Sequence, residues 1–347
     1  ETSKPSSSSN ASSSINNAGA TINDADLIQQ AEDMYGNERL FVAADLLRKV
    51  QDTSLLNDSH RGMLRWADAA QAGMEALLES PESSEEGGSS GYWKKQSESH
   101  GHRDFLVYYH VSTDNELTCR IDSAIESSLL VPILSVFNES ELYKTWMPSW
   151  ERPIKLGIAD TKKLKESGRG NQIIQVTVNM AWPFSTRETV QHAMAIDVIE
   201  EEGKLAIHVM SETPEDDPVI PEPLPGVVRI DFEASFLIGG CPPDHPCLAK
   251  SKSNYPEGEE LIMITMSSRV DPHVAAVPVK LINLVTRTAF GSLWSALLSV
   301  AEEVRDGKRP EHQEAIAAKR ELYDFVEARI DVMIDKVKQK GTTVSEQ

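Results

Sequence analysis

The stretch "PVKLINLVTRTAFGSLWSALLSV", from Pro278 to Val300, decides how the rest of the chain folds. Its apolar residues recur every three or four positions, which predicts one face of a long helix that only Gly291 interrupts. Pro278 suits the first turn of that helix, because a backbone N–H there needs no intrahelical partner. The apolar face consists of Leu281, Leu284, Val285, Thr288, Ala289, Leu293, Leu297 and Val300.

Seven segments before this helix have the residue pattern of β-strands, and several of them are separated by turns that contain Gly or Pro. They follow one another mostly as a meander, so we expect one large antiparallel sheet. A lone sheet with one apolar helix behind it must curl around that helix. The sequence therefore predicts an α+β fold, with a curved antiparallel β-sheet wrapped around a long C-terminal helix. The predicted strands are residues 103–111, 116–125, 171–181, 188–199, 203–212, 226–239 and 260–270.

Four further segments flank this predicted domain, which spans residues 92–305. Residues 1–23 are rich in Ser and Asn and have almost no large apolar side chains, so we expect disorder there. Residues 24–79 have apolar residues at helical spacing and predict a helical extension packed on the domain. The Ser-, Glu- and Gly-rich residues 80–91 form the predicted linker, and residues 306–347 the predicted C-terminal helix and tail.

The composition narrows the functions that the chain can have. Its 347 residues carry a formal net charge of −20 at pH 7, which disfavours binding to nucleic acids. Three cysteines are too few for a disulfide framework and fit a reducing compartment, and no apolar run is long enough to span a bilayer. We therefore expect a cytoplasmic protein without a nucleic-acid partner. The segment from Cys241 to Cys247 lacks a zinc-binding spacing, and we expect neither a metal site nor a cofactor.

Three motifs occur in order along the chain: "VFNESELYKTWMP" at residues 136–148, "MAWPFSTRETV" at 180–190 and "VDPHVAAVPVKLINLVTRTAFGSL" at 270–293. In these motifs and their spacing, the chain resembles the START (steroidogenic acute regulatory protein-related lipid transfer) family over about residues 92–304. The resemblance implies the START-like helix-grip fold. Glu188 stands where the family usually has Asp, so an acidic partner for Arg187 is kept and a structural ion pair between the two is expected. The structural residues of the motifs are Trp146, Trp182, Pro183, Arg187 and Glu188.

The resemblance also implies an internal apolar cavity that takes one lipid or sterol-like molecule, closed by the C-terminal helix. Lipid transfer needs no catalytic residue, and its membrane contact is transient. The apolar alternation in residues 190–196 and 230–238 agrees with a cavity, although such strand faces also suit a solid core. Loops 219–226 and 239–246 are candidate gates. The residues expected at the cavity are His192, Met194, Ile196, His208, Phe232, Phe236, Met263, Leu284, Thr288 and Trp294.

Other interpretations stay open. A cyclase- or hydrolase-like enzyme could act in the same cavity, because the helix-grip fold also hosts enzymes. Such an enzyme should have an inward-facing acid–base pair, and inspection of the sequence gives no nucleophile and base to name. A ligand-sensing scaffold could bind a partner protein through residues 24–79. Histidines at strand positions such as His192 and His208 are more often structural than ligand-binding. A peripheral place at membranes is the alternative to a purely cytoplasmic protein.

Overall fold

The structure of the chain, a computed structural model, describes residues 23–81, 93–100, 102–111, 117–150, 156–180, 185–252, 255–271 and 279–345. The disorder expected before residue 23, most of the expected linker, and the motif residues Trp182 and Pro183 lie outside these ranges. For Leu284 and Thr288, the structure describes the helix but not the side chains.

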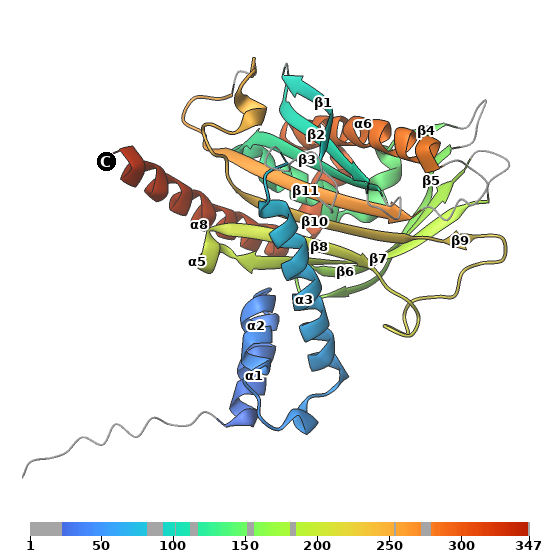
Figure 1. Cartoon of the computed structure of the whole chain (residues 1–347), viewed down its shortest axis with the longest axis vertical. Helices are drawn as coiled ribbons and strands as arrows, with labels where there is room; N and C mark the ends of the chain where they lie inside the picture. The colour runs from blue at the N-terminus through green and yellow to red at the C-terminus, as the bar shows by residue number, and fades with distance from the viewer. Residues whose placement is uncertain are drawn as a thin grey trace, which may run out of the picture.

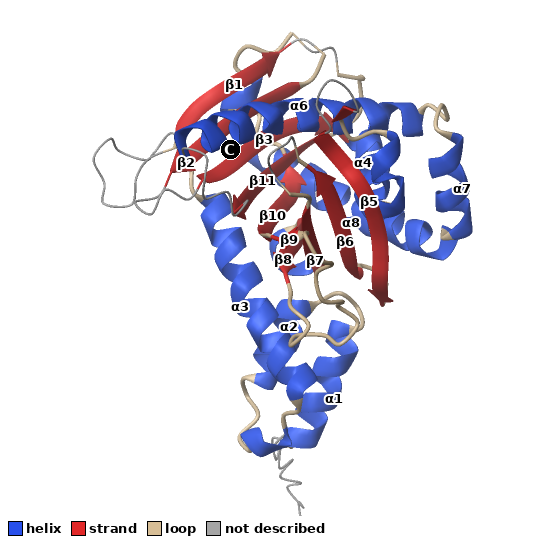
Figure 2. Cartoon of the chain, turned by 90° about the vertical axis from the view of Figure 1, so that its right-hand side faces the viewer, coloured by secondary structure: helices blue, strands red, loops and turns tan. Residues whose placement is uncertain are grey.

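One sheet of eleven strands dominates the described part of the chain and curves around a long helix (Figures 1 and 2). The strand order is β1-β2-β3-β11-β10-β8-β7-β6-β5-β4, with antiparallel neighbours, and the short β9 pairs in parallel with β7. All seven strands predicted from the sequence are present. The strands are β1 Lys94–His100, β2 Asp104–Val111, β3 Leu117–Glu126, β4 Ser149–Trp150, β5 Leu156–Ser167, β6 Asn171–Asn179, β7 Arg187–Val198, β8 Lys204–Ser211, β9 Val228–Arg229, β10 Asp231–Gly240 and β11 Leu261–Asp271.

Two long strands, β1 and β5, are absent from the prediction. β1 has the polar sequence "KKQSESH" and lies at the edge of the sheet, so it has no apolar face to detect. β5 has two irregularities in its pairing with β6, between Ile158 and Asp160 and between Lys163 and Lys165. Each bulge shifts the side-chain alternation by one residue, so the period of two that marks a strand is lost.

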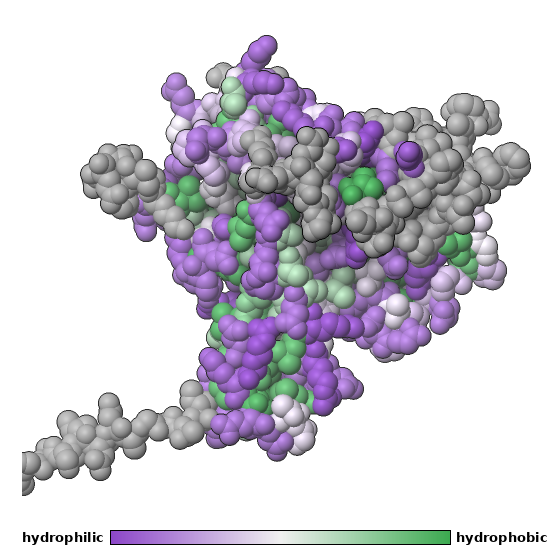
Figure 3. Space-filling model, in the orientation of Figure 1, coloured by the Kyte–Doolittle hydropathy of each residue, from purple (hydrophilic) through white to green (hydrophobic). Residues whose placement is uncertain are grey.

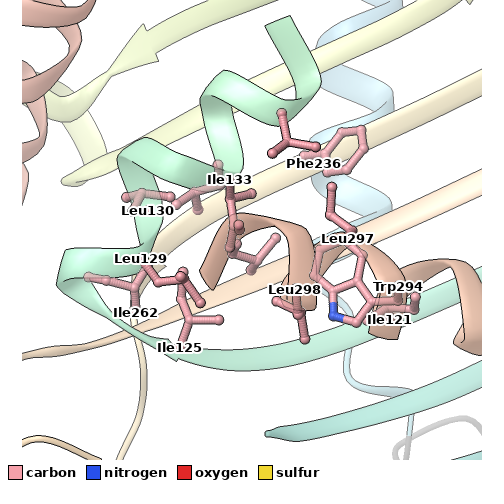
Figure 4. Packing of buried hydrophobic residues seen from close by; sticks show 14 of the residues in the cluster. Ile121, Ile125, Leu129, Leu130, Ile133, Phe236, Ile262, Trp294, Leu297 and Leu298 are labelled. Atoms are coloured by element: carbon pink, nitrogen blue, oxygen red, sulfur yellow. The ribbon is translucent and has the colours of Figure 1, made fainter. Parts of the chain in front are cut away.

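The helix that the sheet surrounds is α6, Val279–Arg305, which contacts β1, β2, β3 and the short helix α4, Leu130–Asn138. Trp294, Leu297 and Leu298 of α6 are buried among side chains of the sheet and of α4 (Figure 4). Burial of each such side chain contributes about 1.5–3 kcal/mol to stability. The predicted helix-grip fold, a curved antiparallel sheet around a C-terminal helix, is therefore confirmed.

Two more helices follow α6 where the sequence predicts one. α7 covers Pro310–Ala318 and α8 covers Arg320–Ser345, with Lys319 between them. Ile330 and Met333 of α8 are buried in the same hydrophobic cluster as α6, so this segment contributes to the main core. No helix in the described ranges is long and apolar enough to cross a membrane.

The three N-terminal helices form a helical extension that projects from the convex face of the sheet (Figures 1 and 2). The side chain of Asn23 caps the first helix, because its Oδ1 accepts a hydrogen bond from the Asp26 N–H at 2.8 Å. Trp66 and Met74 of the third helix are buried with Leu237 of β10. Figure 3 shows apolar residues along the line where the third helix meets the other two. The helices are α1 Asp24–Tyr35, α2 Leu40–Leu47 and α3 Asp58–Leu78.

Candidate functional site

A cavity of about 480 Å³ lies between the concave face of the sheet and the helices α4, α6 and α8. Aromatic and aliphatic side chains make up most of its described lining. Leu293 of α6 belongs to this lining and is also 37% exposed, so it stands between the cavity and solvent. Large apolar residues of the lining include Phe137, Trp146, Ile174, Phe232, Phe236, Phe290 and Trp294.

Two adjacent strands show which face of the sheet holds the cavity. Thr189, Gln191 and Ala193 of β7 line it, as do Ile207 and Val209 of β8. Within each strand these residues are two positions apart, because alternate side chains of a strand point to the same face. β7 therefore contributes two neutral polar side chains to a lining that is otherwise mainly apolar.

The structure brings four of the expected cavity residues together. Phe232 and Phe236 of β10 line the cavity opposite Trp294 of α6, and Met194 of β7 also belongs to the lining. Met194 lies on the other face of its strand from Ala193, and it packs against the helical extension as well. Contact of any of these residues with a ligand stays a prediction.

The other four expected residues with described side chains do not line the cavity, so their predicted place in it is wrong. Ile196 packs among the residues of α1 to α3, and Met263 packs with Tyr108 on the convex face. The prediction took the more apolar alternation of residues 190–196 as the cavity face. That face is apolar because the helical extension covers it, and the cavity face of β7 is the more polar one. The misplaced residues are His192, Ile196, His208 and Met263.

The two histidines instead hold α3 against the sheet. Trp66 of α3 makes edge contacts with both rings, at centroid distances of 4.3 Å to His192 and 5.6 Å to His208. Trp66 Nε1 donates a hydrogen bond to Glu212 Oε1 at 3.0 Å, and His208 Nδ1 lies 3.0 Å from Ser235 Oγ. Burial lowers the pKa of His208, although the carboxylate of Glu233 opposes this shift. Both histidines therefore have a structural role at the contact between α3 and the sheet.

The expected ion pair between Arg187 and Glu188 is also corrected. Glu188 Oε1 accepts from Arg229 Nη2 of β9 at 2.7 Å, and its Oε2 accepts from Gln175 Nε2 of β6 at 2.7 Å. Arg187 Nη1 donates to the backbone oxygen of Ser185 at 2.7 Å. Consecutive residues of a strand point to opposite faces, so Arg187 and Glu188 are poorly placed to pair.

Arg169 is the only charged residue in the described lining, and it lies in the turn between β5 and β6. Its Nη2 is 3.2 Å from Oε2 of Glu38, which belongs to the turn between α1 and α2. Its Cζ lies 3.9 Å from the centre of the Phe325 ring of α8. The positive charge at this edge of the cavity is thus already paired with a carboxylate of the helical extension.

Tyr143 and Tyr323 are the other titratable side chains of the described lining. Burial, and secondly the carboxylate of Glu139, raise the pKa of both phenols, so both are neutral at pH 7. The Tyr143 hydroxyl donates to the Phe137 backbone oxygen at 2.7 Å, and the Tyr323 hydroxyl donates to Glu139 Oε1 at 2.6 Å. Each hydroxyl hydrogen is therefore already engaged within the protein.

The prediction missed the contribution of α8 to the cavity. Leu322, Tyr323 and Val326 line it, although the expected domain ended at residue 305. Their spacing of three or four residues carried the signal, because a helix after residue 305 with an apolar stripe has to pack on something. The described residues contain no group of three or more His, Cys, Asp or Glu side chains suited to a metal ion.

Comparison with solved structures finds several lipid transfer proteins. Human StAR-related lipid transfer protein 5 matches with a TM-score of 0.45 and 12% identity, over 70% of this chain and 98% of that one. A STAR-related lipid transfer protein from Xanthomonas axonopodis matches with a TM-score of 0.44 and 16% identity, over 60% of this chain and 98% of that one. Human STARD10 matches with a TM-score of 0.44 and 13% identity, over 75% of this chain and 84% of that one.

The likeness is one of fold. These structures come from the family that the sequence resembles, but at such identities and TM-scores they carry no argument about the ligand or the activity of this chain. No protein-family model matches the chain, and a search of curated protein sequences finds no match. The function therefore has to be argued from the cavity.

Proposed function

We propose that the protein binds one lipid-like molecule in this cavity and carries it between membranes without catalysing a reaction. The observation that carries the proposal is the cavity itself, about 480 Å³ in volume and lined mainly by apolar side chains. Ligand pockets usually have volumes of about 300–1,000 Å³. Protein interiors are close-packed and have few voids larger than a water molecule, so a space of this size favours a ligand site over a solid core.

The physical reason for such a carrier is the cost of exposing a hydrocarbon chain to water. Burial of each methylene gains about 0.8 kcal/mol, so a long chain moves between apolar hosts rather than through free solution. We propose that α6 closes the cavity and that the ligand leaves when α6 and the neighbouring loops move. Leu224, in the candidate gate loop of residues 219–226, is 67% exposed and is the proposed point of transient membrane contact.

Binding rather than catalysis is proposed because of the titratable groups that the cavity offers. Hydrolases and cyclases need an acid–base pair whose pKa values suit proton transfer near neutral pH. The titratable side chains of the described lining are Arg169, Tyr143 and Tyr323. Arginine stays protonated in proteins, and burial raises the pKa of both tyrosines further above neutrality. None of the three is suited to take up a proton from a substrate at pH 7.

A cavity-filling variant tests the proposal. Ala193 lines the cavity from β7, so Ala193→Phe places a ring in the space that a ligand would occupy. Transfer of a pyrene-labelled long-chain alcohol from donor to acceptor vesicles is followed by fluorescence. We expect the wild-type protein to accelerate transfer in proportion to its concentration. At equal concentration, Ala193→Phe should accelerate transfer at least tenfold less than the wild-type protein.

Ala289→Phe is the matched control, because Ala289, predicted on the apolar face of α6, is exposed and does not line the cavity. It makes the same change in side-chain volume outside the cavity and should transfer at the wild-type rate. Thermal unfolding followed by circular dichroism checks that both variants are folded. Equal loss in the two variants, or no acceleration by the wild-type protein, would refute the proposal.

A further inference from the structure

We infer that the ligand is an uncharged lipid with a hydroxyl as its polar group. This inference rests on the proposed function and narrows the ligand to one chemical class. It excludes fatty acid anions and phospholipids, whose headgroups carry charge. Two properties of the cavity carry it: its charge and the kind of polar group in its lining.

Charge decides against an anionic ligand. Arg169 is the single cation in the described lining, and the Glu38 carboxylate pairs with it at 3.2 Å. A ligand carboxylate would therefore meet an already neutralised guanidinium. Burial of an unpaired ion is costly, and in practice the group takes up a proton instead. A fatty acid would enter as the neutral acid, and its apparent affinity would fall about tenfold for each pH unit above its pKa.

The polar side chains of the lining suit a hydroxyl. Gln172 of β6 and Gln191 of β7 both line the cavity, and each carries a neutral amide that donates and accepts hydrogen bonds. Gln172 is buried, and its Oε1 has no hydrogen-bond partner among the described residues. A hydroxyl can donate to that oxygen and accept from an amide N–H, so it satisfies polar groups that a pure hydrocarbon would leave unpaired.

A pair of ligands with equal chain length tests the inference. Binding of 1-hexadecanol and of palmitate to the delipidated full chain is measured by equilibrium dialysis with radiolabelled ligand at pH 8. We expect one molecule of the alcohol per chain and an affinity at least 100-fold above that of palmitate. Palmitate binding should strengthen as the pH falls towards 6. Dipalmitoylphosphatidylcholine vesicles should yield no bound phospholipid.

A single substitution should change this preference. Glu38→Gln removes the carboxylate that pairs with Arg169 and leaves a free cation at the cavity, so we expect palmitate to bind at least tenfold more tightly and the alcohol to bind as before. Glu201→Gln is the matched control, because it makes the same charge change at an ion pair with Arg39 away from the cavity lining. It should leave both affinities unchanged.

The outcomes separate the two proposals. Tight binding of palmitate to the wild-type chain at pH 8, or one bound phospholipid per chain, would overturn the ligand class and leave lipid binding itself standing. No gain of palmitate affinity in Glu38→Gln would overturn the charge argument. Binding of none of the three lipids would overturn both the ligand class and the proposed function.

Discussion

Trp66 of α3 lies edge-on against His192 of β7, with ring centroids 4.3 Å apart and an interplanar angle of 62°. This contact fixes the helical extension to the convex face of the sheet, on the far side of the strand from the cavity. It also explains why an apolar strand face at residues 190–196 does not belong to the ligand site. The extension buries its apolar side chains against a separate apolar face of the sheet, to which β7 and β8 contribute.

Removal of the Trp66 ring should destabilise the protein. Trp66 is buried, and truncation of a buried Trp to Ala costs about 3–5 kcal/mol, so Trp66→Ala should lower the free energy of unfolding by about that amount. Trp66→Phe keeps most of the ring and loses the hydrogen bond to Glu212, so it should cost less. Urea unfolding followed by circular dichroism gives both values. Equal, small losses below about 1 kcal/mol would show that α3 is not held through this residue.

Stability should fall in mild acid because of His208. Burial lowers its pKa in the folded state below the ordinary value of 6.5, so the unfolded state binds the proton more readily. The stabilisation by neutral His208 is therefore complete above pH 6.5 and is lost as the pH falls through the folded-state pKa. The slope between these pH values is at most about 1.4 kcal/mol per pH unit for one group.

His208→Gln removes this titration and should flatten the dependence of the free energy of unfolding on pH below about 6.5. His312, whose pKa burial also lowers, is left in place and contributes to the slope that remains. Urea unfolding at several pH values provides the measurement. An unchanged slope in His208→Gln would show that this histidine is not buried as the structure has it.

Gly291→Ala should stabilise the protein. A Cβ at this position would lie 3.4 Å from Val107 Cγ2 and 3.5 Å from Ser97 Oγ, which are ordinary contact distances. Ala is favoured over Gly inside a helix by about 0.8–1 kcal/mol, and no clash opposes this gain. Gly240→Ala is the contrast, because its Cβ would lie 2.8 Å from Val337 Cγ1. Thermal unfolding should show a higher midpoint for Gly291→Ala and a lower one for Gly240→Ala.

Glu188 should be coupled energetically to Arg229 rather than to Arg187. Glu188 is 2% exposed and accepts from Arg229 Nη2 at 2.7 Å, so a double-mutant cycle with Glu188→Gln and Arg229→Met should give a coupling energy of about 1–3 kcal/mol. The same cycle with Arg187→Met should give a value near zero. A larger coupling to Arg187 would restore the pairing that the sequence motif implied.

The sequence was sufficient for the fold but not for the orientation of every strand. The alternation of Phe232 and Phe236 depends on one buried face, and the prediction places both residues correctly against the core. The stripe predicted for α6 is correct at Leu297 and Val300, which are buried, and wrong at Ala289 and Leu293, which are exposed. β7 has two covered faces, one against the helical extension and one against the cavity. Residues 190–196 alone cannot tell these faces apart, because hydrophobicity reports burial and not which partner covers the strand.

Two other features depended on tertiary contacts that local patterns do not contain. The bulges of β5 break its alternation, and only its pairing with β6 shows that it is a strand. The pairing of Arg169 with Glu38 joins residues 131 positions apart in the chain, across the main domain and its extension. Neither residue stands in a recognisable motif, so the neutralised charge at the cavity could be found only from the structure.

If the cavity holds one hydrophobic molecule, native mass spectrometry of the purified full chain should detect that molecule. We expect a 1:1 complex with a small hydrophobic molecule, either carried through purification or taken up from lipid vesicles. The complex should be lost in Ala193→Phe and kept in Ala289→Phe. A wild-type spectrum that shows only the bare chain, both as purified and after incubation with vesicles, would contradict the proposed function.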